Sequence, residues 1–321
     1  MNVLADKHHA GLFHSLQLLA GRLGWTLYTP VGLDWWTAGY WRFGQGYGDD
    51  RLAQQFLRHD FDVDGEFPDA PIATVTLEQA QAMDWDYVIS SVPDNERGFW
   101  RFAQEHGAQF VEQVGNTGQW VDWSLDPLVL SSSEMPIEGR GVVYHQEMDP
   151  IAFAPPLWAH DAASFVNCMP SMGTCWDLLR EAQQLAPIDV YGIDGTAGPE
   201  AIVKPNTRLI ASMAVYGWGW HDKQQGDGFG HVIHSWAAVG RPLVGHASHY
   251  RGKMAESFWD DLVTCIDLDR HSVADAVDII RTISPTQHEA MCREIRARFD
   301  AIDYDAEADA IRDLLGLAVP A

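Results

Sequence analysis

The chain of 321 residues has little positive charge: 21 Lys and Arg stand against 45 Asp and Glu, which gives a formal net charge of −24. A surface this acidic repels polyanions, which argues against general binding to nucleic acid or to an anionic membrane. The remaining Lys and Arg still suffice for a local basic groove. Otherwise the acidity is typical of a soluble, and in some cases halotolerant, protein.

Cysteine and long apolar runs are also scarce. The four cysteines show no Cys-x-x-Cys pairing, which favours reduced, buried thiols in a reducing compartment. No run approaches the roughly 20 apolar residues of a membrane span. The first residues, MNVLADKHH, lack the apolar core of a signal peptide. These absences predict a cytoplasmic protein without a membrane span.

What the chain does contain is typical of a globular protein. Hydrophobic residues make up 46% and charged residues 21%, and the length suits two domains of ordinary size. The 14 Trp are many. Many of them lie in the first half, as large surfaces to bury or to offer to a ligand, among them Trp35, Trp36, Trp41, Trp85, Trp100, Trp120 and Trp123.

Short apolar runs alternate with helical patterns through the first half, which predicts α/β units with largely parallel strands. Between them, residues 32–68 form an irregular insertion that is either an acceptor pocket or a packed surface excursion. We expect strands at 2–6, 25–30, 86–93, 108–116 and 127–133, and helices at 11–24, 76–83 and 95–107.

A proline-bearing linker over 142–156 separates a second α/β series. There we expect strands at 164–170, 188–195, 242–244 and 263–269, and helices at 174–186, 231–240, 271–283, 285–300 and 304–317. The predicted fold class is α/β, with two Rossmann-like domains and a cleft between them. The predicted domains are 1–145 and 146–321, and the final helix packs on its own domain or crosses back to the first.

Residues 217–231, GWGWHDKQQGDGFGH, are unusually rich in glycine. Gly217, Gly219, Gly226, Gly228 and Gly230 allow positive φ and a close approach of the backbone to a ligand. The helix expected after them presents free N–H groups and a partial positive charge at its start, which is an anion site. A phosphate-bearing donor fits this arrangement. A flexible surface loop in front of a core helix is the other interpretation.

The stretch DGFGHVIHSWAAVGRPLV, residues 227–244, resembles the donor-site segment of glycosyltransferases with the GT-B fold. Retaining members of that group carry Glu-x-Phe-Gly, a helix with a second Glu, and then Ala-x-Gly-x-Pro-Val. The resemblance extends to 250–269 and more weakly to 1–30. The matching residues are Phe229, Gly230, Ala238, Gly240, Pro242 and Val244.

This resemblance implies transfer of a sugar from a nucleoside-diphosphate sugar, of UDP or GDP type. The carboxylate pair is altered, because Asp227 and Ser235 stand where the two Glu are expected. In the family the first Glu contacts the donor sugar and the second the nucleotide ribose. Asp227 keeps an acceptor for sugar hydroxyls on a shorter arm, whereas Ser235 offers no charge.

We therefore expect donor binding along the loop and the start of the helix. Among the available cations we favour Lys223 and Lys253 to stabilise the leaving diphosphate. No metal and no other cofactor is expected, because the 14 His show no His-Glu-x-x-His or Cys/His spacing typical of zinc sites. The donor-binding candidates are Lys223, Gly226, Gly228, Phe229, Gly230, His231, Ser235 and Lys253.

The loop after the first strand supplies the acceptor-side candidates. His8 and His9 are expected there, and a neutral imidazole acts as a base toward an acceptor hydroxyl. Together with Asp227 they are the predicted catalytic residues, while Gly11 and Asp34 are expected beside the acceptor. The alternative for each histidine is a hydrogen-bonded structural role.

The predicted function is that of a metal-independent hexosyltransferase. Its partners are a nucleotide-sugar donor and a small-molecule or glycan acceptor. A modified DNA base of a virus is the less favoured acceptor, because the net charge opposes duplex binding. A nucleotide-sugar epimerase and a catalytically silent sugar-nucleotide binding module remain the alternative functions.

Overall fold

The computed structural model describes residues 1–6, 10–41, 73–91, 95–115, 119–148, 158–165, 175–191 and 212–317. The chain divides into two units. Unit 1 comprises Met1–Asp149 and Tyr304–Ala321, and unit 2 comprises Pro150–Asp303. None of the described helices is long and apolar enough to cross a membrane.

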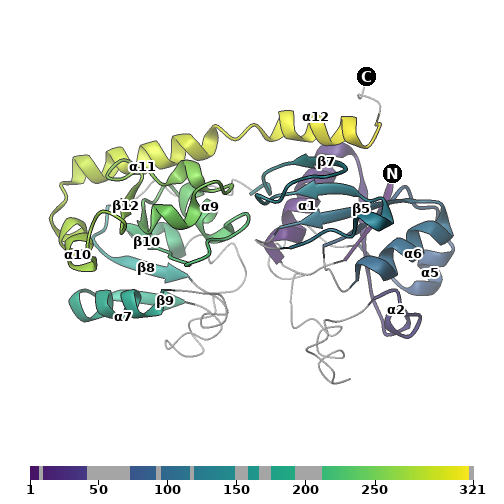
Figure 1. Cartoon of the computed structure of the whole chain (residues 1–321), viewed down its shortest axis with the longest axis horizontal. Coiled ribbons are helices and arrows are strands. Elements are labelled where there is room, and N and C mark those ends of the chain that lie inside the picture. The colour runs from purple at the N-terminus through teal and green to yellow at the C-terminus, as the bar shows by residue number, and fades with distance from the viewer. Residues whose placement is uncertain are drawn as a thin grey trace. The chain divides into compact units, whose positions relative to one another are not determined.

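Unit 1 is built on a seven-stranded sheet in the order β3-β2-β1-β4-β5-β6-β7 (Figure 1). Every neighbouring pair of strands is parallel. The strands are β1 (Asn2–Ala5), β2 (Thr26–Pro30), β3 (Ala73–Val75), β4 (Tyr87–Ser90), β5 (Gln109–Val114), β6 (Leu128–Ser131) and β7 (Arg140–Val143).

Alternation along β1 explains the two helical layers of unit 1. Val3 and Ala5 pack in one core with α1 (Ala10–Leu23) and α12 (Tyr304–Leu314). Leu4, between them in sequence, packs in another core on the opposite face. The elements around that second core are α2 (Asp34–Thr37), α5 (Leu77–Gln81) and α6 (Glu96–His106).

The last helix belongs to unit 1. Ala308, Ile311 and Leu315 are buried in the core that contains β1 and α1. The hydroxyl of Tyr87 donates to the carbonyl oxygen of Leu315 at 3.0 Å. Helix α12 is therefore part of the fold of the first unit although it is the last helix in the chain.

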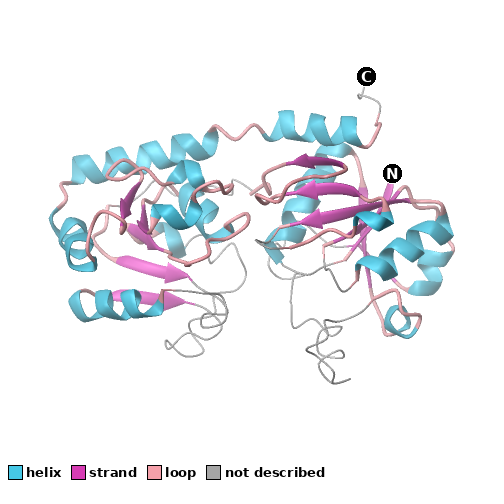
Figure 2. Ribbon diagram, in the orientation of Figure 1, coloured by secondary structure: helices cyan, strands magenta, loops and turns pink. Residues whose placement is uncertain are grey.

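Unit 2 contains a five-stranded parallel sheet in the order β12-β11-β10-β8-β9 (Figure 2). Its strands are β8 (Ala162–Phe165), β9 (Ile188–Tyr191), β10 (Trp218–Trp220), β11 (Leu243–Gly245) and β12 (Cys265–Asp267). Its helices are α7 (Trp176–Leu185), α9 (His231–Ala238), α10 (Val273–Thr282) and α11 (Pro285–Asp300). The described residues also form three short 3₁₀ turns: η1 (Trp123–Leu125) in unit 1, and η4 (Ala247–Tyr250) and η5 (Glu256–Phe258) in unit 2.

Local sequence signals set several helix ends. Ser272 and Ser284 cap α10 and α11 through reciprocal hydrogen bonds with Asp275 and Gln287. Helix α6 ends at Gly107, whose φ of 66° is left-handed. These signals are short-range, which is why the sequence places these helices to within a few residues.

The two parallel sheets and their helices confirm the predicted α/β fold class with two Rossmann-like regions. Three strands are not predicted. Strand β3 is missed, and β7 lies partly where a linker is predicted to begin. The third, β10, lies within the predicted glycine loop.

The prediction of a ligand-facing glycine loop is wrong over 217–220, because this segment contains a buried strand. Trp218 and Trp220 point into the core of unit 2, and Gly219 provides the space into which the indole of Trp236 packs. Of the five glycines in 217–231, only Gly226 and Gly230 adopt positive φ.

Replacing Gly219 by Ala is expected to destabilise unit 2 by about 1–3 kcal/mol, because overpacking forces neighbours to shift. A Cβ atom there would lie 2.4 Å from Trp236, which is fully buried. Thermal unfolding measures this loss. Gly21→Ala is the control, since a Cβ at Gly21 in α1 would meet nothing within 4 Å, and it should leave the chain as stable or more stable. A Gly219→Ala protein as stable as the wild type would contradict this packing.

Some predicted features lie outside the described residues. Among them are His8 and His9, residues 42–68 of the insertion, most of the linker, and residues 166–170 and 192–195 of the strands expected at 164–170 and 188–195.

Candidate functional site

Polar side chains gather at the carboxyl edge of the five-stranded sheet. His221, Asp222 and Lys223 follow β10 directly, and His246 follows β11. The strand order reverses between β8 and β10, since β9 lies on one side of β8 and β10 on the other. In open parallel sheets this switch point, outside the carboxyl ends, is where ligands bind.

Asp227 lies at the centre of a small charged group. Its carboxylate contacts Nε2 of His221 at 2.9 Å through one oxygen and accepts a hydrogen bond from Nζ of Lys223 through the other. The side chains of His221 and Lys223 are almost entirely buried, and that of Asp227 is 18% exposed. The structure thus brings together two predicted site residues, Lys223 and Asp227.

Asp227 remains ionised in this setting. Burial alone would raise its pKa, but the hydrogen bond and charge of His221 and the charge of Lys223 together bring the pKa below its usual value. Asp227 is therefore a hydrogen-bond acceptor of fixed orientation. It is poorly suited to take up a proton as a general base.

The glycine loop proper spans residues 226–230. Gly226 has a φ of 65°, and a Cβ atom on it would lie 2.3 Å from the carbonyl oxygen of His249 and 2.7 Å from Cε of Lys253. The loop is thus held closely against η4 and the stem of Lys253. A third predicted donor residue, Lys253, therefore lies beside the loop, and its side chain is half-buried.

Phe229 anchors this loop in the protein interior. It is only 1% exposed, and its ring stacks on His234 with centroids 3.9 Å apart. Gly228 and Gly230 on either side are buried too. Phe229 consequently shapes the loop through packing.

Helix α9 begins directly after the loop. Gly230 is its N-cap, in a left-handed conformation with a φ of 80°, and no side chain caps the first turn. His231, the first helical residue, is half-buried. The hydroxyl of Ser235 donates to the carbonyl oxygen of His231 at 2.8 Å, so this side chain is turned back onto its own helix.

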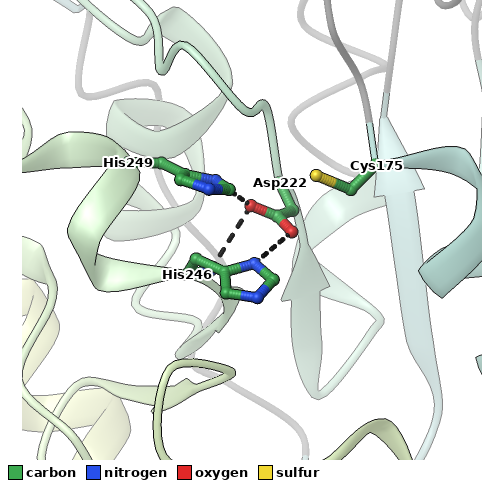
Figure 3. A group of neighbouring side chains, drawn as sticks. All are labelled: Cys175, Asp222, His246 and His249. Carbon is green, nitrogen blue, oxygen red and sulfur yellow. Dashed lines mark hydrogen bonds and ion pairs between the residues drawn. The ribbon is translucent and has the colours of Figure 1, made fainter.

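Asp222 organises a second group at the same edge, which the sequence analysis missed (Figure 3). Its carboxylate accepts hydrogen bonds from Nδ1 of His246 at 2.7 Å and Nδ1 of His249 at 2.8 Å. The sulfur of Cys175, at the N-cap of α7, points toward the same carboxylate. The spacing His246-x-x-His249 was the one local signal for this group.

The acceptor-side candidates lie in unit 1. Gly11 is in the first turn of α1, and Asp34 is exposed at the first position of α2. Among the described residues at the carboxyl ends of β1 and β4, the prominent group is Asp6, which is 2% exposed. It accepts hydrogen bonds from the Oγ atoms of Ser90 at 3.0 Å and Ser91 at 2.6 Å and from the amide of Ser91 at 2.8 Å.

Unit 1 also contains a buried carboxyl pair. Glu112 on β5 and Glu96 on α6 are each 2% exposed and interact with one another. Burial, followed by the charge of Glu96, raises the pKa of Glu112 to about 9. Glu112 is therefore protonated at neutral pH, although nothing in the sequence distinguishes it from an ordinary strand glutamate.

No protein-family model matches the chain. A search of curated proteins finds no match.

Solved structures do match the whole chain. HepE of Anabaena, in complex with UDP and glucose, is 14% identical with a TM-score of 0.60, covering 98% of this chain and 99% of that one. An Escherichia coli structure described as trehalose-6-phosphate bound with UDP-2-fluoro glucose is 12% identical with a TM-score of 0.59, covering 100% of both chains. A glycosyltransferase from Rickettsia africae is 11% identical with a TM-score of 0.58, covering 98% and 97%.

The chain has two α/β units, each built on a sheet of parallel strands. Together with these structural matches, they establish the GT-B fold for this chain. The resemblance stated from residues 227–244 and the structural likeness thus agree on the fold.

Proposed function

We propose that this protein transfers a sugar from a nucleoside-diphosphate sugar to a small-molecule or glycan acceptor. One observation carries the proposal. At the carboxyl edge of a parallel sheet in a GT-B fold, the segment Asp227–Gly230 leads into a helix whose first turn has no side-chain cap. Free backbone N–H groups at such a helix start bind phosphate oxygens.

Each donor-side residue then has a role that its position supports. The first amides of α9 hold the diphosphate, and His231 lies within the same turn. Lys253 adds positive charge beside the loop and stabilises the charge that develops as the diphosphate leaves. Asp227 accepts hydrogen bonds from sugar hydroxyls through the exposed part of its carboxylate.

Two features distinguish the proposed donor site from the family pattern. The ammonium group of Lys223 donates a hydrogen bond to Asp227. We therefore propose that Lys223 orients this carboxylate and does not contact the diphosphate directly. Ser235 bonds to its own helix, and we therefore propose that the nucleoside is held without a carboxylate at that position.

The nucleotide of the donor is suggested by the structurally similar proteins. HepE and the E. coli protein were solved with UDP and UDP-2-fluoro glucose, which favours a UDP-sugar donor. We propose that the α9 dipole and Lys253 assist departure of the diphosphate without a metal ion bound to it. His8 or His9 deprotonates the acceptor. The reaction takes place in the cytoplasm. A catalytically silent binding module is the second candidate, favoured by the two altered positions Asp227 and Ser235.

A thermal-shift titration tests donor binding directly. Saturating UDP or UDP-glucose, at about 100 times Kd, should stabilise the fold by about 2.7 kcal/mol and raise the melting temperature accordingly. Lys253→Ala should weaken binding at least about tenfold, equivalent to ~1.4 kcal/mol. Arg251→Ala is the matched control, because Arg251 is an exposed cation two residues away and should leave the titration unchanged.

Turnover separates the two candidates. Release of UDP from UDP-glucose, slow in water alone and faster with acceptor, supports a transferase. Donor binding without release in the presence of a panel of sugar acceptors supports the silent module. The absence of a shift with every nucleoside diphosphate and nucleotide sugar would reject both.

A further inference from the structure

Four side chains from three separate segments of unit 2 lie close together. They are Cys175 at the start of α7, Asp222 after β10, and His246 and His249 at the start and within η4. One potential ligand atom from each residue lies within 4.8 Å of all the others. Among the described residues, this is the one group of at least three His, Cys, Asp or Glu side chains with such a spacing.

The backbone holds these segments in place independently of any ligand. The amide of Cys175 donates to the carbonyl oxygen of Asp222 at 3.1 Å, and the amide of His249 donates to the carbonyl oxygen of His246 at 3.2 Å. Residues three apart in a 3₁₀ turn project from the same side. Both imidazoles therefore present Nδ1 to the same carboxylate, as Figure 3 shows.

The chemistry of the group suits zinc and does not suit the cations that prefer oxygen ligands alone. Thiolate, imidazole and carboxylate are the ligands of Zn²⁺, whereas Mg²⁺ and Ca²⁺ prefer oxygen atoms alone. One thiolate and one carboxylate balance the two positive charges of the ion, and two neutral imidazoles complete four ligands. Burial assists, since Asp222 is 4% exposed and the other three residues are half-buried.

We propose that Cys175, Asp222, His246 and His249 bind a zinc ion. Ligand atoms around tetrahedral zinc lie roughly 3.3–3.8 Å apart, given Zn–N near 2.0 Å and Zn–S near 2.3 Å. To reach this spacing, the two distances from Nδ1 to the carboxylate of Asp222 lengthen by less than about 1 Å. The sulfur of Cys175 moves toward the imidazoles and the carboxylate. Each imidazole moves its proton from Nδ1 to Nε2, and the thiol releases its proton to solvent.

Four protein ligands close the coordination sphere, so the ion is structural and no open position remains for a substrate. Its effect is to tie together the start of α7, the end of β10 and the segment η4. Two of these segments flank the loop of Gly226, whose closest neighbour is the carbonyl oxygen of His249. The proposal does not depend on sugar transfer, because the ligands and their geometry belong to this unit alone.

Cobalt titration of the untagged, metal-stripped full chain tests the site. One equivalent of Co²⁺ should produce the intense ligand-field bands of a tetrahedral ion and a thiolate-to-cobalt charge-transfer band, and Zn²⁺ should displace it. Zinc should also raise the melting temperature, and a chelator should return it to the metal-free value. Elemental analysis of the purified protein gives the metal content.

Variants locate the ion. Cys175→Ser should abolish the charge-transfer band, and His249→Gln should weaken zinc binding by more than the roughly 10–100-fold typical of residues that only support a ligand. Cys292→Ala and Cys168→Ser, which remove other thiols, and His271→Gln, which removes an imidazole bonded to Asp261, should bind as the wild type does. Circular dichroism confirms that each variant is folded.

Two outcomes overturn the proposal. One is a wild-type chain that binds neither Co²⁺ nor Zn²⁺ with a dissociation constant below about the micromolar range. The other is a charge-transfer band that persists in Cys175→Ser or vanishes in a control variant. If Cys175→Ser does not fold, the His249→Gln titration decides between the site and a metal bound elsewhere.

Discussion

Replacing Asp227 by Ala is expected to lower the free energy of unfolding by about 3 kcal/mol at pH 7, because it leaves Lys223 buried without its partner. Lys223 is 5% exposed, and its ammonium group donates to Asp227. Urea unfolding followed by tryptophan fluorescence measures the loss. The same variant should bind UDP-glucose no better than Lys253→Ala does.

A double variant shows whether the loss comes from the stranded charge. Lys223→Met combined with Asp227→Ala removes both charges, and it should be more stable than Asp227→Ala alone. Asp278→Ala, at an exposed position of α10, should change stability by no more than about 0.5 kcal/mol. A double variant as unstable as the sum of the two single variants would show that the pair is not coupled.

Replacing Glu112 by Gln is expected to stabilise the protein strongly at pH 8 and little at pH 5. In the unfolded chain the carboxyl group ionises around its ordinary pKa of 4.5, whereas in the fold its pKa is raised to about 9. The folded state thus holds a proton that the unfolded state has lost, so stability falls as the pH rises from about 4.5 toward 9. At ~1.36 kcal/mol per pH unit this amounts to several kcal/mol at pH 8.

Glutamine removes that dependence because its side chain does not ionise. Glu96 is the charged neighbour of Glu112. Glu96 accepts a hydrogen bond from the amide of Asp122, and the carboxylate of Asp122 accepts one from Arg97. The melting temperature of Glu112→Gln should exceed that of the wild type by about 5 °C or more at pH 8. Glu78→Gln, at an exposed position, should shift it by less than about 1 °C. A Glu112→Gln protein that melts lower at both pH values would contradict a protonated Glu112.

Most of the fold is predictable from the sequence because its signals are local. Apolar periodicity, Gly107 at the end of α6, and the Ser272 and Ser284 caps act within one or two turns. Strand β10 escapes prediction because Trp218-Gly219-Trp220 is short and lies in the glycine-rich segment 217–231. Only the fold reveals that Gly219 accommodates Trp236, which follows 17 residues later in the chain.

The candidate site, too, has parts that can be predicted from the sequence and parts that cannot. The segment Asp227–Gly230 is contiguous, so its position before a helix can be predicted from its residues. The partners of Asp227 are harder to predict, since His221 and Lys223 reach it only because β10 ends where it does. The Asp222 group is harder still, because Cys175 and His246 are 71 residues apart in the chain and meet only through strand order.

Helix α12 bears on how the chain acquires its structure during synthesis. Because residues 304–317 complete the core that Val3 and Leu16 begin, the first unit has an unfilled apolar face until the ribosome has made these residues. Unit 2, which is continuous in sequence, has all its residues available earlier and is able to finish folding first. A released chain truncated after residue 303 should therefore hold a native second unit, while its amino-terminal part remains sensitive to protease.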